Sequence, residues 1–271
     1  MKVYFNTKTF EHYYSELDVT RNPAEAELLV MGAKTVKIEE FTNLRAIYRF
    51  GVGIENIPFE YARTRDIPIF FPSEKTKEIL FDSTANFAAY LIFRMHYGHC
   101  LGDPAKWLKQ ARDYLGHKKL LVVGMGNIGK RVSEKMSHYM HIMEFDVRIN
   151  PISELHNLIS SADFISLHIP LTPENRDFID GEKLSWMKDD VVFINTSRGA
   201  LVNEESLYNR LMRTNMRAAF DVFWIEPYQG KLATLSPEKF FMTPHSASQT
   251  KEFVENSFLE ILDIAKGSQS R

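Results

Sequence analysis

The sequence has little of several features that define other classes of protein. It contains one cysteine, Cys100, among 271 residues, which excludes an internal disulfide and a thiolate metal site, so we predict no metal and interpret Cys100 as a buried or partly buried small residue. Neither sign of charge dominates, because 33 Lys and Arg residues stand against 35 Asp and Glu residues. A net charge of -2 gives no reason to expect nucleic acid or an acidic membrane surface as a partner.

Long hydrophobic runs are also missing. The longest aromatic and aliphatic run, Phe87 to Phe93, is far shorter than the roughly twenty residues that span a bilayer. The N-terminal segment, Met1 to Phe5, lacks the apolar core of a signal peptide. Together with the low cysteine content, these absences predict a cytoplasmic protein with no membrane partner.

The pattern of the first hundred residues predicts a parallel sheet. At 271 residues and 44% apolar, the chain is long enough for two domains. Short apolar runs alternate with polar stretches, as in βαβ units; the runs are Lys2 to Phe5, Glu27 to Met31, Leu44 to Tyr48 and Ile67 to Phe71. From Asp82 or Ser83, a plausible N-cap, Phe87, Leu91 and Met95 indicate a long helix. Gly98, Gly102 and Pro104 then break the pattern, and we place a domain boundary there.

The stretch Lys118 to Asp146 has the order of a dinucleotide-binding unit. Leu120 to Val123 is typical of a strand buried on both faces, and it leads into Gly124-Met125-Gly126-Asn127-Ile128-Gly129. Apolar side chains then recur every four residues, as on one face of a helix, at Ile128, Val132, Met136 and Met140. A second strand, Ile142 to Phe145, is followed by Asp146.

Each part of this unit has a physical role in holding a dinucleotide. Gly124 permits the sharp turn, Gly126 lets backbone amides approach a pyrophosphate, and Gly129 lets helix and strand pack closely. The helix start at Asn127 and Ile128 offers unpaired N–H groups and a partial positive charge. Asp146 can accept hydrogen bonds from a ribose diol and would repel a 2′-phosphate, so we predict NAD rather than NADP. The alternative is a glycine-rich turn that serves packing alone.

Three polar residues follow other apolar runs. Arg198 comes after Phe193 to Ser197, Glu226 after the strand that ends at Val222, and His245 after Thr243-Pro244. Ligands of open parallel sheets bind at the carboxyl ends of the strands, so these three residues are candidates for a site. An Arg can grip a carboxylate, a His can donate a proton, and a Glu can orient that His, which is what reduction of a 2-oxo acid requires. Each residue taken singly also fits a purely structural loop.

The order of motifs in this chain resembles the D-isomer-specific 2-hydroxyacid dehydrogenase family. After the glycine motif, the resemblance is carried by Ser166-Leu167-His168-Ile169-Pro170-Leu171-Thr172, Asn195-Thr196-Ser197-Arg198-Gly199, Ala219-Phe220-Asp221-Val222-Phe223 with Glu226-Pro227, and Thr243-Pro244-His245. Upstream, Arg49 to Ile57 resembles the family's first substrate loop.

The resemblance implies an α/β fold of two Rossmann-like, doubly wound parallel-sheet domains with the active site in the interdomain cleft. A substrate-binding domain would cover residues 1–96, completed by 248–271, and an NAD-binding domain would cover 97–247. The family is usually dimeric through its nucleotide domain, so we also expect a homodimer.

By position in the motifs, Arg198 would bind the substrate carboxylate or carbonyl, His245 would be the acid/base and Glu226 its partner. Asp221 would hold the nicotinamide carboxamide. The resemblance implies further cofactor contacts at His168, Pro170, Thr196 and Asp146, and substrate contacts at Arg49, Val52 and Gly53.

We therefore predict an oxidoreductase that transfers a hydride between NAD(H) and a small D-2-hydroxy acid or 2-oxo acid. The alternative is an NAD(H)-responsive binding protein of corepressor type with little or no turnover. Glu55, Asn86 and a charged segment, Ser73 to Asp82, depart from the family pattern. We expect that segment to form a loop near the cleft, where it leaves the choice of acid open; the alternative is a solvated surface insertion.

Overall fold

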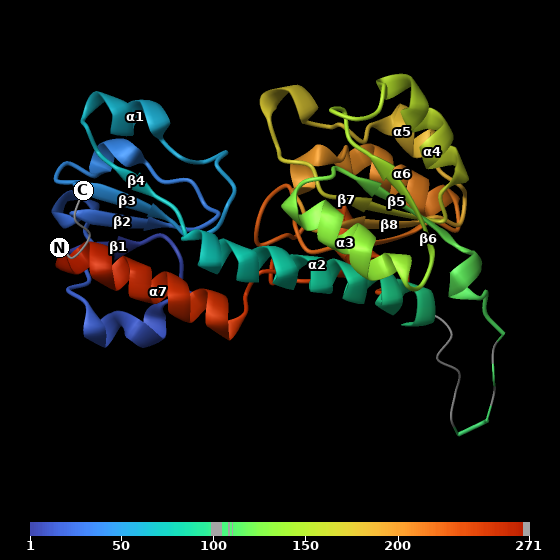
Figure 1. Ribbon diagram of the computed structural model, residues 1–271, viewed down its shortest axis with the longest axis horizontal. Helices are drawn as coiled ribbons and strands as arrows, with labels where there is room; N and C mark the ends of the chain where they lie inside the picture. Colours follow the sequence, from blue (N-terminus) through green and yellow to red (C-terminus); the bar gives the residue numbers. More distant parts are fainter. Residues whose placement is uncertain (99–104, 108, 110, 268–271) are drawn as a thin grey trace. The chain divides into compact units, whose positions relative to one another are not determined.

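The chain divides into two compact units in the computed structural model, which describes residues 1–98, 105–107, 109 and 111–267 (Figure 1). Unit 1 comprises Met1–Leu80 and Gln249–Arg271, and unit 2 comprises Phe81–Ser248. Each unit is built on a parallel sheet with helices around it, which confirms the predicted fold class. The prediction that Cys100 is buried, and the predicted helix breakers Gly102 and Pro104, lie outside the described residues.

Unit 1 contains a four-stranded sheet in the order β1-β2-β3-β4. Its strands are β1 (Val3–Phe5), β2 (Leu28–Met31), β3 (Ala46–Arg49) and β4 (Ile69–Phe70). Its helices are α1 (Phe59–Thr64), the start of α2 (Glu74–Tyr97) and α7 (Lys251–Lys266), and its 3-10 turns are η1 (Glu11–Glu16), η2 (Pro23–Glu25) and η3 (Ile38–Glu40). All four predicted apolar runs therefore overlap strands.

The last helix of the chain packs into unit 1 through aromatic rings and one carboxylate. Phe50 stacks on Phe253 of α7 with ring centroids 4.9 Å apart. Glu260 of α7 accepts hydrogen bonds from the Tyr48 hydroxyl at 2.7 Å and the Thr76 hydroxyl at 2.7 Å. Because buried hydroxyl groups need partners, Glu260 ties the end of the chain to strand β3 and to the first turn of α2.

Unit 2 contains a six-stranded parallel sheet in the order β10-β9-β8-β7-β5-β6. The strands are β5 (Lys119–Val123), β6 (His141–Phe145), β7 (Phe164–Leu167), β8 (Val192–Asn195), β9 (Arg217–Phe220) and β10 (Phe240–Met242). The helices that follow the strands are α3 (Asn127–Ser137), α4 (Leu155–Ser161), α5 (Gly181–Trp186) and α6 (Glu204–Arg213). The 3-10 turns are η5 (Leu115–His117), η6 (Ile152–Glu154), η7 (Pro173–Asn175), η8 (Gly199–Leu201) and η9 (Lys231–Thr234).

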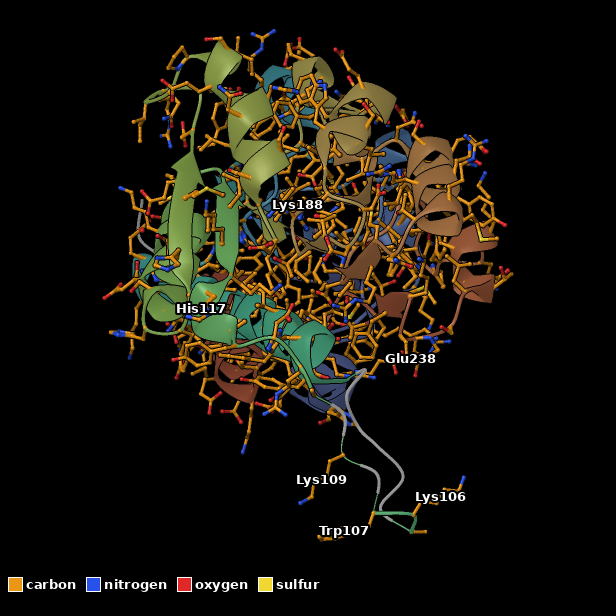
Figure 2. All side chains as sticks on the ribbon, turned by 90° about the vertical axis from the view of Figure 1, so that its right-hand side faces the viewer. Lys106, Trp107, Lys109, His117, Lys188 and Glu238 are labelled. Carbon is orange, nitrogen blue, oxygen red and sulfur yellow. The ribbon has the colours of Figure 1, made fainter. Side chains whose placement is uncertain are left out.

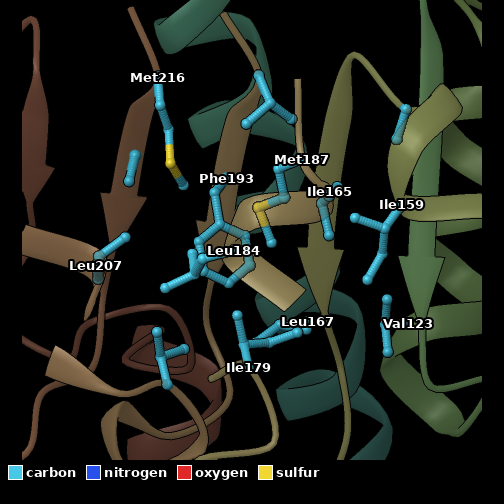
Figure 3. Close-up of a cluster of buried hydrophobic side chains, with 14 of the residues drawn as sticks. Val123, Ile159, Ile165, Leu167, Ile179, Leu184, Met187, Phe193, Leu207 and Met216 are labelled. Carbon is cyan, nitrogen blue, oxygen red and sulfur yellow. The ribbon is translucent and has the colours of Figure 1, made fainter. Parts of the chain in front are cut away.

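The first strand of unit 2, β5, lies between β6 and β7, so the strand order reverses beside it. Successive side chains of a strand point to opposite faces of the sheet, so β5 contributes side chains to two hydrophobic cores. Leu121 and Val123 pack with α4, α5 and α6, whereas Leu120 and Val122 pack with α2 and α3. Figure 3 shows the first of these cores, in which Ile165, Leu167 and Phe193 of neighbouring strands meet Ile159, Leu184 and Leu207.

Helix α2 begins at Glu74, which corrects the prediction that the charged segment is a loop and that the helix starts at Asp82 or Ser83. Ser73 caps the start, since its hydroxyl accepts the Thr76 N–H at 3.3 Å, and Lys77 pairs with Glu74 one turn apart at 2.8 Å. The charged side chains misled the prediction because the first turns of a helix carry charge as readily as a loop does.

The division between the units falls within α2, between residues 80 and 81, whereas the sequence suggested residues 96 and 97. The reason is packing: Ala88, Leu91 and Met95 of the second half of α2 are buried against the six-stranded sheet. Gln249, where the chain returns to unit 1, is one residue beyond the predicted 248.

The sequence places Phe253, Leu259, Leu262 and Ile264 on a final helix, and the buried face of α7 differs in part from this prediction. Phe253 and Ile264 are buried as expected, whereas Leu259 is 56% exposed and Phe258 and Ile261 are buried instead. Among the helices in the described part of the chain, none has the length and apolar character needed to cross a membrane.

Candidate active site

The predicted cofactor and catalytic residues of unit 2 all follow the carboxyl ends of its strands. Gly124 follows β5, Asp146 follows β6, and His168 follows β7. Thr196 and Arg198 follow β8, Asp221 and Glu226 follow β9, and His245 follows β10. Because all six strands are parallel, these residues share one edge of the sheet, the edge at which ligands of doubly wound folds bind.

The glycine turn has the geometry that a pyrophosphate requires. Gly124 has a φ of +98°, and a Cβ there would lie 2.5 Å from the carbonyl oxygen of His168, so both backbone conformation and space demand glycine. A Cβ on Gly126 would meet nothing within 4 Å, which leaves open space at the start of α3. No side chain caps α3, so the N–H groups at Asn127 and Ile128 are available to an anion.

Asp146, the predicted ribose ligand, is 7% exposed and lies against this turn. Its carboxylate accepts the Met125 N–H at 2.9 Å, which joins the end of β6 to the glycine turn. Arg148 also binds the carboxylate, and its hydrogen bonds hold the pKa of Asp146 well below its usual range. The group is therefore a carboxylate at neutral pH.

Two buried polar atoms at this edge have no hydrogen-bond partner among the described residues: Nδ1 of His168 and Oγ1 of Thr196. His168 uses its other ring nitrogen, Nε2, in a hydrogen bond with Ser166 Oγ at 2.8 Å, and burial lowers its pKa to about 3, so the ring is neutral. Buried polar groups are normally satisfied by hydrogen bonds. His168 follows β7, the neighbour of the strand that leads into the glycine turn, and Thr196 follows β8, the next strand along the sheet. They fit a site that receives a polar ligand. Pro170, a third predicted cofactor contact, is exposed.

His245 and Glu226 form a hydrogen-bonded pair. His245 Nδ1 lies 2.8 Å from Glu226 Oε2, and the other carboxylate oxygen accepts the Phe223 N–H at 3.0 Å. Burial alone would raise the pKa of Glu226, but the hydrogen bond and charge of His245 lower it below its ordinary value. The carboxylate is thus ionised and can only accept, so the Nδ1 of His245 carries the hydrogen.

The backbone of His245 has a φ of 52°, in the left-handed region that a residue with a side chain rarely adopts. Asp221, which is fully buried, holds this loop: its carboxylate accepts the Ser246 and Ala247 N–H groups, each at 2.9 Å. Strained residues persist where neighbouring structure determines them, and they cluster at functional sites. Asp221 therefore positions the loop that presents His245.

Arg198 lies next to the histidine pair. A Cβ on Gly199 would overlap the backbone of Phe223 and Trp224, so the loop that carries Arg198 packs directly on the loop that carries Glu226. The guanidinium charge is close enough to contribute to the lowered pKa of Glu226. The structure thus brings a guanidinium, a carboxylate and an imidazole together within one unit, as a carboxylate-binding acid/base site requires.

The predicted substrate residues Arg49, Val52 and Gly53 belong to unit 1, at the carboxyl end of β3. Arg49 is 3% exposed and donates hydrogen bonds to the carbonyl oxygens of Gly32 at 2.6 Å and Gly53 at 2.6 Å. Its side chain therefore shapes the loop that contains Val52 and Gly53. A direct contact between these residues and substrate stays a prediction.

The profile described as D-isomer specific 2-hydroxyacid dehydrogenase, NAD binding domain, matches residues 94–247. The chain belongs to the D-isomer specific 2-hydroxyacid dehydrogenase family. Hydroxypyruvate reductase of Thermotoga maritima is 31% identical in an alignment that covers 94% of this chain and 88% of that protein.

Two further comparisons extend this result. D-3-phosphoglycerate dehydrogenase of Methanocaldococcus jannaschii is 28% identical over 84% of this chain but only 47% of its own length, so the chain spans about half of that relative. The crystal structure of D-lactate dehydrogenase from Aquifex aeolicus with NAD and lactic acid has the same fold, with a TM-score of 0.81 at 21% identity over 99% of this chain and 95% of that one.

Membership in the 2-hydroxyacid dehydrogenase family confirms the predicted enzyme class and the NAD cofactor. The residues present fit that cofactor, since the open space at Gly126, the uncapped helix α3 and the unpartnered atoms of His168 and Thr196 lie at one edge of the sheet.

Sequence reasoning missed several residues that build this site. Asn195, Thr243 and Arg148 hold the residues it did identify. Arg148 could have been recognised from the sequence, because an arginine two residues after an acidic residue at a strand end can bind that carboxylate. Asn195 and Thr243 sit within motifs already quoted, but only the structure reveals where their side chains point.

Proposed function

We propose that this chain reduces a small 2-oxo acid with NADH, and oxidises the matching D-2-hydroxy acid in the reverse direction, with His245 as acid/base and Arg198 as the carboxylate clamp. The observation that carries the proposal is the 2.8 Å pair of His245 and Glu226 with the Arg198 charge beside it. A site that only sensed NAD(H) would need neither a proton donor nor a clamp.

His245 supplies the proton to the ketone oxygen. Glu226 occupies Nδ1, so Nε2 is the nitrogen that faces the substrate; it makes no hydrogen bond within the described residues, and the side chain is 31% exposed. Glu226 fixes the ring orientation and the identity of the hydrogen-bearing nitrogen. In the reverse direction, the same Nε2 accepts the hydroxyl proton.

Arg198 binds the acid group of the substrate. Its planar guanidinium can make two parallel hydrogen bonds to a carboxylate, which fixes the ketone carbon in position. When bound, the nicotinamide supplies the hydride to that carbon. Positive charge on His245 and Arg198 stabilises the negative charge that develops on the ketone oxygen, and both groups are fixed before the reaction begins.

We also propose that the chain is a cytoplasmic homodimer that associates through unit 2. Supporting the dimer, Tyr90 and Tyr97 of α2 are 47% and 39% exposed, and Trp107 is 77% exposed. Figure 2 shows Trp107, with Lys106 and Lys109, away from the bulk of the side chains. Exposed aromatic side chains that recur along one helix are typical of a surface that a partner covers.

Mixing the protein and NADH with a panel of 2-oxo acids, and following NADH absorbance, tests the activity. The panel should span glyoxylate, pyruvate, hydroxypyruvate, its phosphorylated form and bulkier acids. We expect catalytic loss of absorbance with at least one acid and none with the corresponding simple ketones, because Arg198 needs a carboxylate. Tight NADH binding without turnover of any acid would favour the corepressor-like alternative.

A further inference from the structure

Asp146, the acidic residue at the end of β6, forms an ion pair with Arg148. In a dinucleotide-binding fold an isolated carboxylate at this position accepts the ribose hydroxyls and repels a 2′-phosphate. Here Arg148 Nε lies 2.8 Å from Asp146 Oδ1 and Arg148 Nη2 lies 2.6 Å from Asp146 Oδ2. This two-pronged ion pair cancels the negative charge on which the rejection of NADP depends.

The turn after β6 holds Arg148 in this position. Asp146 Oδ1 accepts the Arg148 N–H at 3.0 Å, and the Asp146 carbonyl accepts the Ile149 and Asn150 N–H groups, each at 2.8 Å. Asn150 closes the turn by accepting the Asp146 N–H at 3.2 Å. Since the backbone is fixed on both sides of the arginine, its placement over the carboxylate is built into the turn.

Arg148 keeps part of its hydrogen-bonding capacity. A guanidinium carries five N–H donors, and Nε and Nη2 face Asp146. The two N–H groups of Nη1 make no hydrogen bond to any described residue, and the side chain is 70% exposed. The edge of the guanidinium that faces away from Asp146 is therefore free for a second anion.

We propose that Arg148 is a specificity-determining residue that neutralises Asp146 and offers Nη1 to a 2′-phosphate, so that the site accepts NADP(H) as well as NAD(H). The inference rests on the proposed function, since it concerns the cofactor of that same site. It refines the expectation drawn from Asp146 alone, which favoured NAD over NADP.

The test compares the dissociation constants of NADH and NADPH by fluorescence titration for the wild type, Arg148→Ala and Arg148→Lys. For the wild type we expect the two constants to agree within about tenfold. Arg148→Ala should weaken NADPH at least about tenfold, the loss expected for one charge-assisted hydrogen bond, while NADH changes less than about threefold. Arg148→Lys keeps the positive charge but loses the planar guanidinium, so its dissociation constant for NADPH should lie between those of the wild type and Arg148→Ala.

Arg63→Ala is the matched control. It removes one positive charge and a comparable exposed pair, Arg63 with Glu60 at 2.7 Å, from unit 1, and it should leave both constants unchanged. Calorimetric titration with 5′-AMP and with adenosine 2′,5′-bisphosphate isolates the adenosine end of the site. The bisphosphate should lose affinity selectively in Arg148→Ala.

Wild-type protein that binds NADH at least about a hundredfold more tightly than NADPH would overturn the inference while leaving the proposed function intact. Equal weakening of both cofactors in Arg148→Ala would do the same, since it would show a structural role only. Failure of the wild type to bind either cofactor would remove the proposed function and this inference with it.

Discussion

Asn195 holds the backbone turn that carries Arg198. It is fully buried at the end of β8; its amide donates to the Arg198 carbonyl at 2.8 Å, and its side-chain oxygen accepts the Ser197 N–H at 2.9 Å. Both hydrogen bonds close the turn between the strand and the arginine. Arg198 was identifiable from the sequence, but the backbone turn that carries it depends on this neutral neighbour.

Asn195→Ala should destabilise the protein by about 1–3 kcal/mol, the cost of leaving buried partners unpaired. It should also raise the KM for the 2-oxo acid more than it changes the dissociation constant of NADH, because the carboxylate clamp moves while the glycine turn stays. Urea unfolding and steady-state kinetics measure the two effects. Asn209→Ala, on the exposed side of α6, is the control and should change neither; a KM unchanged in Asn195→Ala would contradict this role.

Gly126 in the glycine turn and Gly199 in the η8 loop differ in the space around them. A Cβ on Gly126 meets nothing, whereas a Cβ on Gly199 overlaps the neighbouring loop. Gly126→Ala should therefore keep the melting temperature of the wild type but bind NADH at least about tenfold more weakly, since its methyl group occupies the space of a pyrophosphate. Gly199→Ala should lower the melting temperature. Scanning calorimetry and NADH titration check the pair, and the reverse pattern would show that the turn serves packing alone.

Most elements of the fold were predictable because local sequence determines them. Leu120 to Val123 has the apolar pattern of a strand buried on both faces, and all four residues lie in β5. Prediction failed where distant contacts decide. The start of α2 depends on Thr76 meeting Glu260, far along the chain, and the burial of Phe258 in place of Leu259 depends on rings from the first segment, such as Tyr13 at 4.3 Å.

The site was predictable in its residue types but not in its hydrogen bonds. His245, Glu226 and Arg198 were found from strand ends and the family pattern. Asp221 was expected to hold the nicotinamide carboxamide, and that contact stays a prediction; the structure adds that its carboxylate accepts hydrogen bonds from the loop that carries His245. No spacing rule predicts such a bond, because it joins the ends of neighbouring strands whose registers are set by the whole sheet.

At the scale of the whole molecule, the proposed dimer predicts a sedimenting mass of twice 31.4 kDa. Tyr90→Arg places a charge on the exposed aromatic face of α2 and should shift the protein toward the monomer, since an unpaired charge is costly in a covered interface. Met212→Arg, at a 58% exposed position of α6, is the control and should leave the mass unchanged. A monomeric wild type at micromolar concentration would contradict the proposal.

The central claim is that one imidazole, held by one carboxylate, moves the proton in a reaction driven by a nicotinamide. The most direct measurement is the turnover number of His245→Ala with the preferred 2-oxo acid, alongside its dissociation constant for NADH. We predict a loss of at least about a hundredfold in turnover, the low end for general acid catalysis, with NADH binding retained. Wild-type turnover in His245→Ala would contradict the account.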